Sequence, residues 1–198
     1  MKALLIDNFD SFTFNLVDFL RLLDVEVKTY RNIINPEKID QIKPDFLVFS
    51  PGPSVPNNAG NLLKIIDQYY EKYPMFGVCL GHEALIEAFG GSLKFVPPVH
   101  GKKSSIHHDK KTIFKNIKQD FQAGRYHSLV GDNIPDCFEV SSKVDDLAMS
   151  MRHKNLPIES VQFHPESVLT MENNNGLKLM KNFIETYFGK IFFKLRIN

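Results

Sequence analysis

The clearest chemical signal in the sequence is a cysteine set between two glycines. Residues 77–81 read Gly-Val-Cys-Leu-Gly, after an apolar run and before a helical pattern. Such a pattern allows a sharp turn from a strand into a helix, which lifts the central side chain out of the sheet. Cys79 would lie at a helix N-terminus, which favours the thiolate, and the N–H of Leu80 would meet a developing oxyanion. The pattern predicts a nucleophile, and the alternative is a buried core cysteine.

A second motif supplies the base that a thiol nucleophile needs. Residues 162–166 read Gln-Phe-His-Pro-Glu. The proline biases His164 toward an extended conformation, in which residues two apart point the same way, so Glu166 can lie beside His164. Glu166 would hold the imidazole in one tautomer while its other nitrogen meets Cys79. Alone the motif is typical of a surface turn, but with the cysteine turn it favours a triad.

Two further segments could bind a substrate. Residues 50–54, Ser-Pro-Gly-Pro-Ser, follow an apolar strand pattern and would lie at the carboxyl end of a strand, where α/β proteins bind ligands. Gly52 would let the backbone approach a ligand and would offer a second oxyanion N–H. Residues 125–129, Arg-Tyr-His-Ser-Leu, could present backbone groups to a substrate. The alternatives are a proline-rich turn and an ordinary edge strand.

Other histidines and cysteines give weaker signals. His107, His108 and Asp109 are residue types that bind metals, but neighbours in a strand point apart and no second cluster has suitable spacing. We therefore expect no metal site. His82 is expected to support the cysteine turn through hydrogen bonds, and Cys137 to lie in the core.

The elements that must position these residues alternate between strand and helix. Nearly continuous apolar runs predict strands buried on both faces, at residues 2–7, 46–49 and 75–79. Apolar residues at helical spacing predict helices between and after them, at residues 11–23, 58–73 and 80–89. This alternation predicts an α/β fold with a doubly wound sheet and helices on both faces.

After residue 91 the pattern changes to short strands with few helices. The expected strands are residues 92–96, 103–107, 121–127, 137–142, 148–153 and 160–163, and a final helix is expected over 176–187. Turn signals separate them, among them Gly131-Asp132. Because no linker or repeat divides the chain, we expect a single domain over residues 1–190 and a basic, apolar C-terminal tail over 191–198.

Composition excludes several classes of function. The net charge is +1, from 24 Lys+Arg against 23 Asp+Glu, so nothing calls for nucleic acid or an acidic membrane as a partner. No apolar run approaches the ~18 residues of a membrane span, and Asp7 and Asp10 argue against a signal peptide. Two cysteines in unlike surroundings indicate a reducing, cytoplasmic compartment and no disulfide.

The motifs together resemble those of the class I glutamine amidotransferases. The resemblance rests on Gly-Val-Cys-Leu-Gly-His at 77–82, Ser-Pro-Gly-Pro at 50–53, Arg-Tyr-His-Ser-Leu at 125–129 and Val-Gln-Phe-His-Pro-Glu-Ser at 161–167. Two more blocks, Asp-Asn-Phe-Asp-Ser-Phe-Thr at 7–13 and His-Gly-Lys at 100–102, are similar to those of the small subunits of anthranilate synthase and aminodeoxychorismate synthase.

This resemblance implies a flavodoxin-like core and the hydrolysis of L-glutamine, with ammonia passed to a chorismate-binding synthase subunit. The product would be anthranilate or 4-amino-4-deoxychorismate, so the tryptophan and folate pathways both stay open. By position, Cys79 is the nucleophile, His164 the base, Glu166 its orienter, and Gly52 and Leu80 the oxyanion donors. The implied glutamine contacts are Gly52, Pro53, Ser54, Glu83, Ser128 and Leu129. No cofactor is expected in this chain, and the partner subunit is expected to need Mg²⁺.

Two positions depart from the family pattern. Position 54 is Ser where many members have Gly, and position 83 is Glu where the family typically has Gln. An ionised Glu83 could accept but not donate a hydrogen bond, and it would raise the pKa of the Cys79 thiol one helical turn away. We expect His164 and the helix N-terminus to outweigh this effect, with activity below that of a protein with Gln there. The alternative is that Glu83 pairs with a lysine.

Two other functions stay open. A γ-glutamyl hydrolase or cysteine peptidase on a related fold would share the cysteine turn and a histidine, but the blocks at 50–53, 125–129 and 161–167 argue against it. A catalytically weak regulatory subunit would fit Glu83, but the complete set of triad residues argues against it.

Overall fold

The structure is a computed structural model that describes residues 1–189, and the predicted tail of residues 191–198 lies outside them. The strands are β1 (Lys2–Asp7), β2 (Glu26–Arg31), β3 (Phe46–Phe49), β4 (Met75–Val78), β5 (Ser92–Phe95), β6 (Lys102–His108), β7 (Phe121–Arg125), β8 (Leu129–Asn133), β9 (Phe138–Val144), β10 (Leu147–His153) and β11 (Ile158–Val161). The α-helices are α1 (Thr13–Leu22), α2 (Lys38–Ile42), α3 (Leu62–Tyr69), α4 (Leu80–Ala88) and α5 (Asn175–Phe188). Short 3₁₀ turns are η1 (Pro56–Asn58), η2 (Thr112–Phe114), η3 (Val168–Thr170) and η4 (Glu172–Asn174).

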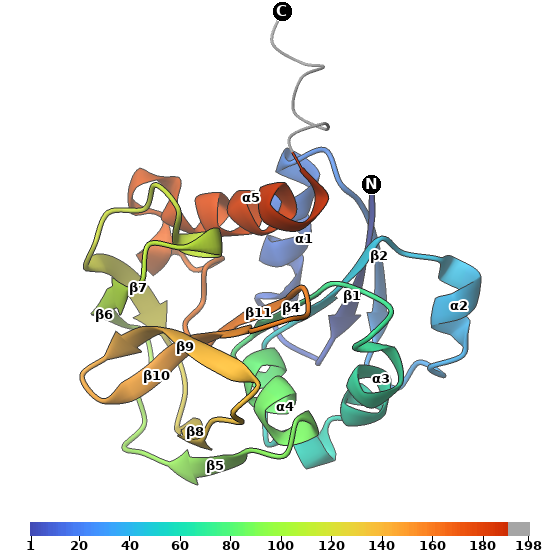
Figure 1. The fold of residues 1–198 in the computed structure, drawn as a ribbon, viewed down its shortest axis with the longest axis horizontal. Coiled ribbons are helices and arrows are strands. Elements are labelled where there is room, and N and C mark those ends of the chain that lie inside the picture. The colour runs from blue at the N-terminus through green and yellow to red at the C-terminus, as the bar shows by residue number, and fades with distance from the viewer. Residues whose placement is uncertain (190–198) are drawn as a thin grey trace, which may run out of the picture.

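One large mixed sheet organises the molecule (Figure 1). Its strand order is β2-β1-β3-β4-β11-β10-β9-β6-β7, and a small second sheet pairs β5 with β8. Strands β2, β1, β3, β4 and β11 run parallel, whereas β10, β9, β6 and β7 are antiparallel to their neighbours. The predicted α/β fold with a doubly wound mixed sheet is confirmed.

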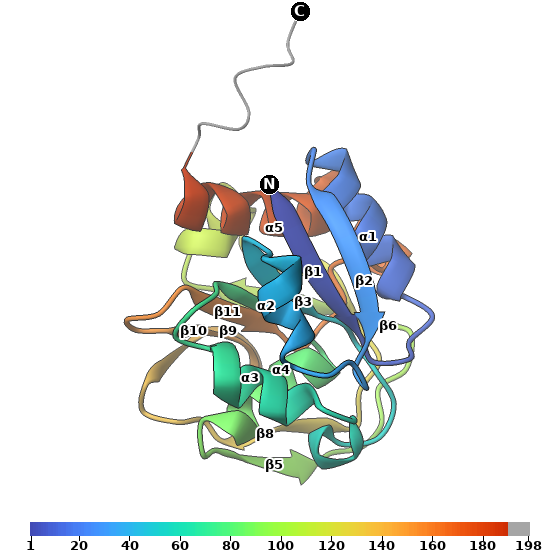
Figure 2. The same cartoon turned by 90° about the vertical axis from the view of Figure 1, so that its right-hand side faces the viewer.

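Helices cover both faces of the parallel strands, as Figure 2 shows. Along β3, Phe46 and Val48 pack in the cluster that contains the buried residues of α1 and α5, while Leu47 and Phe49 pack with those of α2, α3 and α4. Because both faces are covered, polar residues have no place in this strand, which explains its continuous apolar sequence.

Three elements escaped prediction. Strand β2 is the edge of the large sheet, and its exposed residues are charged, so it lacks an apolar run. Helix α2 is only five residues long. The expected turn at Gly131-Asp132 is wrong, because both residues lie inside β8. There Gly131 permits close packing, since a Cβ at this position would lie 2.4 Å from Ile134 Cδ1.

The carboxyl ends of the parallel strands meet at one edge of the sheet. Chain segments leaving β1, β3, β4 and β11 at this edge carry Asn8, Ser50, Cys79 and Gln162, respectively. This is the edge at which open α/β sheets bind ligands. Within the described residues, no helix combines the length and apolar character needed to cross a membrane.

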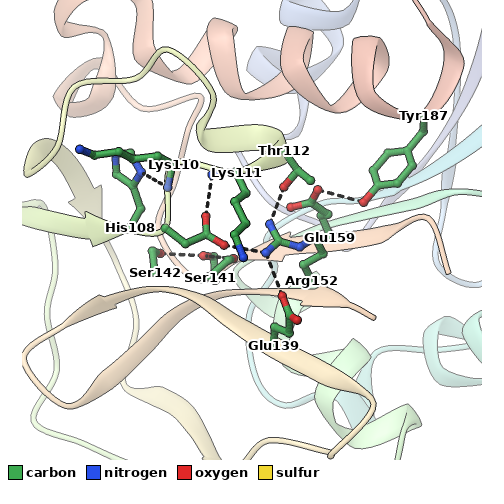
Figure 3. A network of polar contacts seen from close by, with 12 residues as sticks. His108, Lys110, Lys111, Thr112, Glu139, Ser141, Ser142, Arg152, Glu159 and Tyr187 are labelled. Carbon is green, nitrogen blue, oxygen red and sulfur yellow. Dashed lines mark hydrogen bonds and ion pairs between the residues drawn. The ribbon is translucent and has the colours of Figure 1, made fainter. Parts of the chain in front are cut away.

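An ion-pair network around a nearly buried arginine joins the antiparallel strands to the segment beneath α5 (Figure 3). Arg152 on β10 donates to Asp109 Oδ2 at 2.6 Å and to Glu139 Oε2 at 3.0 Å through Nη2, and to Thr112 Oγ1 at 2.7 Å through Nη1. The Arg152 side chain is only 10% exposed. A charge so buried stabilises the fold only while its partners remain in place.

We expect Arg152→Met to lower the free energy of unfolding by about 2–4 kcal/mol, because it leaves the Asp109 carboxylate without its cation. Urea denaturation of the two proteins measures the difference. Arg21→Met is the matched control, since Arg21 pairs with Asp18 at 3.7 Å with both side chains well exposed, and such pairs contribute little. An equal loss in both variants would contradict a structural role of the network.

Candidate active site

Cys79 lies on a sharp turn between β4 and α4. Its backbone has φ 51° and ψ −104°, a combination that non-glycine residues rarely adopt. The flanking glycines make the turn possible, because a Cβ on Gly77 would lie 2.6 Å from Gly81 O and one on Gly81 would lie 2.5 Å from Phe49 O. The strand–turn–helix arrangement predicted from residues 77–81 is therefore present.

His164 and Glu166 form the predicted pair. The Nδ1 atom of His164 lies 2.7 Å from Glu166 Oε1, and both side chains are buried. The backbone N–H of His164 donates to Gly124 O at 3.0 Å, and Thr170 Oγ1 donates to His164 O at 2.6 Å, which fix this segment. Among the described residues, His164 Nε2 has no hydrogen-bond partner. The ring is thus oriented through one nitrogen and keeps the other for chemistry.

Two cavities share Cys79. The larger, of about 480 Å³, is lined by Cys79 and His164 together with Phe9, Asp10, Ser11, Phe12, Pro51, Gly52, Pro53, His100 and Tyr126. The smaller, of about 170 Å³, is lined by Cys79, Gly52, Pro53, Ser54, Glu83, Tyr126, His127, Ser128 and Leu129. Every residue that the sequence predicts to contact glutamine therefore lies at this smaller cavity, although the roles of these residues stay predictions.

The two predicted oxyanion donors are neighbours. A Cβ on Gly52 would lie 2.5 Å from Leu80 Cδ2 and 2.6 Å from Asn8 Cβ, so only glycine fits between these loops. The N–H of Leu80 interacts with the Cys79 thiol and lowers its pKa. Ser54 has φ 70°, a left-handed conformation that favours glycine. A glycine would adopt this conformation without the strain that serine carries there.

Burial opposes the thiolate form of Cys79. Its pKa is raised well above the ordinary value, first by burial and then by the carboxylates of Glu83, Glu166 and Asp10. We expected His164 and the helix N-terminus to keep Cys79 as a thiolate, and this expectation is wrong for this structure. The N–H of Leu80 lowers the pKa of the thiol, but burial and the three carboxylates raise it by more. The thiol form of Cys79 is therefore favoured in this structure.

The sequence left two states open for Glu83, an ionised carboxylate beside Cys79 and a carboxylate paired with a lysine. The structure differs from both. Burial raises the pKa of the Glu83 carboxyl group to about 8, with a smaller contribution from Glu87, so it is not ionised at neutral pH. Its hydrogen-bond partner is Gln162, whose Nε2 donates to Glu83 Oε1 at 2.8 Å. No ion pair to a lysine is found for it among the described residues.

The remaining candidates have structural surroundings. His107 is exposed near Asp120, His108 stacks on Phe114, and Asp109 binds Arg152. Within the described residues no cluster of three or more His, Cys, Asp or Glu could hold a metal ion. His82 Nδ1 lies 2.8 Å from Ser160 Oγ, so this side chain supports the turn as predicted.

Sequence reasoning missed three contacts at the site. Tyr126 and Phe12 flank the His164 ring, with centroid distances of 4.9 and 5.4 Å. Gln162 approaches Cys79 Sγ at 3.9 Å. All three residues lie inside the motif blocks, but their contacts join segments far apart in the chain, which residue spacing does not report.

Comparison with known proteins agrees with this geometry. A 47% identical relative is the anthranilate synthase component 2 of Methanocaldococcus jannaschii, with 93% of this chain and 97% of that protein covered. The aminodeoxychorismate/anthranilate synthase component 2 of Bacillus subtilis is 46% identical, with 93% and 96% covered. Among solved structures, a Thermoplasma acidophilum protein provisionally named as part of a GMP synthase superposes with a TM-score of 0.82 at 27% identity, over 93% and 92% of the two chains.

The family model described as glutamine amidotransferase class-I matches residues 4–185. This match spans the cysteine turn, the His164–Glu166 pair and both cavities. The chain belongs to the class I glutamine amidotransferases.

Proposed function

We propose that this protein is the glutaminase subunit of a chorismate-using synthase. It hydrolyses L-glutamine through Cys79, His164 and Glu166 and delivers ammonia to a partner subunit that makes anthranilate or 4-amino-4-deoxychorismate. The observation that carries the proposal is the cysteine turn and the oriented histidine on one cavity, with all predicted glutamine contacts on the adjoining one. The names of the relatives, anthranilate synthase component 2 and aminodeoxychorismate/anthranilate synthase component 2, support this choice of product.

The chemistry is acyl transfer from a carboxamide. Cys79 Sγ attacks the side-chain carbonyl carbon of glutamine while its proton passes to His164 Nε2. The N–H groups of Gly52 and Leu80 stabilise the oxyanion. His164 then protonates the leaving ammonia, and water activated by the same ring hydrolyses the thioester to glutamate. Glu166 keeps Nδ1 protonated and stabilises the imidazolium that forms.

Features at the mouth of the larger cavity support an interface with the synthase subunit. Two motif blocks with no catalytic group, residues 8–13 and 100–102, both contribute side chains to this cavity. Among the residues that line it, Phe9 is 50% exposed. Exposed apolar side chains near a functional cleft are typical of a protein interface. Ammonia released at Cys79 would leave through this cavity toward the partner, which we expect to need Mg²⁺.

The test is glutamine hydrolysis with and without the synthase subunit. We expect the isolated chain to be slow, because its thiol is protonated and such sites are commonly completed by closure or association. The subunit that co-purifies should raise kcat/KM for glutamine, and the complex should convert chorismate and glutamine to one of the two products. A glutamine-like electrophile should label Cys79. Full activity without any partner, or cleavage of peptides, would contradict the proposal.

A further inference from the structure

Gln162 connects the nucleophile to the position at which this chain departs from its family. Its side chain is fully buried just beyond β11. The Nε2 atom donates to Glu83 Oε1 at 2.8 Å and approaches Cys79 Sγ at 3.9 Å. The backbone N–H of Gln162 donates to Met149 O at 2.8 Å, so the large sheet fixes where this amide lies. One side chain therefore contacts both groups.

Among residues 1–189, no cation contributes to the pKa of Glu83. On α4 it is near Cys79 and Glu87, and across the smaller cavity lie Tyr126 and His127. Burial and then the charge of Arg125 lower the pKa of His127 to about 4, so its imidazole is neutral. An uncompensated carboxylate in such a position is costly. The carboxyl group is thus expected to keep its proton at neutral pH.

This inference rests on the proposed glutaminase function. We propose that Gln162 is a positioning residue that fixes the Glu83 side chain at the smaller cavity, where the buried carboxyl group works as a neutral carboxylic acid. One carboxyl oxygen accepts from Gln162, and the other carries the proton and donates it in a hydrogen bond to an acceptor on substrate glutamine. A neutral acid offers one donor and acceptor capacity. Glu83 can therefore both accept and donate a hydrogen bond at this cavity, as long as it stays protonated.

Ionisation of Glu83 would remove this function. Above pH 8 the carboxyl group loses its proton, since burial raises its pKa to about that value. The site then loses a donor and gains a negative charge one helical turn from Cys79, which opposes formation of the thiolate. The rate of glutamine hydrolysis should therefore fall above pH 8. This fall should be absent in Glu83→Gln, because an amide does not ionise.

The kinetic test follows kcat/KM for glutamine from pH 6.5 to 9.5 in the complex with the synthase subunit. We expect kcat/KM of Glu83→Gln divided by kcat/KM of the wild type to rise about tenfold between pH 7 and pH 9. The reason is that one unit above the pKa only about a tenth of Glu83 stays neutral. Glu71→Gln is the matched control: it removes an exposed carboxyl group that lines neither cavity, and its ratio should stay nearly flat. A flat ratio for Glu83→Gln overturns the inference.

A second measurement does not depend on activity. Carbon-13 NMR of glutamate carboxyl groups in the full chain, assigned by the signal lost in Glu83→Gln, should show Glu83 titrating near pH 8. In Gln162→Met the midpoint should move higher, because Gln162 donates to the carboxyl group and lowers its pKa. A midpoint near the ordinary ~4.3, or one unmoved by Gln162→Met, overturns the inference. Absence of glutamine hydrolysis in the wild-type complex would instead refute the proposed function.

Discussion

Cys79→Ala should abolish glutamine-dependent synthesis by the complex and leave ammonia-dependent synthesis intact. Alanine cannot form the thioester, so hydrolysis should fall by about 10⁴–10⁶-fold, as when the nucleophile of a comparable triad is removed. Ammonia supplied in solution bypasses this chain, because the partner holds the chorismate chemistry. The measurement is product formation from chorismate with glutamine or with an ammonium salt, under otherwise equal conditions.

Two companion variants sharpen this result. His164→Ala should cost nearly as much as Cys79→Ala, and the double variant no more than either, because triad members act as a unit. Cys137→Ala is the matched control, since Cys137 is half-buried and lies on neither cavity. Glutamine hydrolysis that survives in Cys79→Ala would remove this residue from the mechanism.

Local constraints made the catalytic turn and its base readable from the sequence. The glycines of residues 77–81 are required by contacts within the turn and its own strand neighbours, so their spacing carries the geometry. The pairing of His164 and Glu166 follows from two-residue spacing in an extended segment. The parallel strands were visible because burial on both faces removes polar residues from them.

Protonation states could not be read in the same way. The pKa values of Cys79 and Glu83 depend on burial and on groups that arrive from other parts of the chain. Gln162, the hydrogen-bond partner of Glu83, is separated from it by 79 residues. A sequence gives residue types at these positions but not how much water reaches them. The expectation of an ionised Glu83 beside a thiolate failed for this reason.

A protonated thiol in the isolated chain is compatible with a partner-dependent enzyme. Burial raises the pKa of Cys79, and the oriented His164 nearby has a free Nε2 within the described part of the chain. The base is therefore present, while the resting state does not favour the thiolate. Under the proposed function, such a site would release little ammonia until substrate and partner favour proton transfer.

Glu166→Gln should lower kcat for glutamine by about 10³–10⁴-fold while changing KM little. Glutamine has the length of glutamate, and Glu166 Oε2 has no partner among the described residues, so the change alters one contact. That contact is the 2.7 Å bond to His164 Nδ1. An amide carries no negative charge to stabilise the imidazolium, and if its NH₂ donates to Nδ1, it fixes the tautomer whose Nε2 cannot accept the thiol proton.

Steady-state kinetics of the complex, together with the rate at which a glutamine-like electrophile labels Cys79, would measure this effect. Glu172→Gln is the matched control, because it removes an exposed carboxylate from the same C-terminal segment and should keep wild-type kinetics. Glu166 lines neither cavity, so it has no direct route to substrate affinity. A rise in KM at constant kcat would therefore assign Glu166 to substrate binding and leave His164 without an orienter, which the buried 2.7 Å contact argues against.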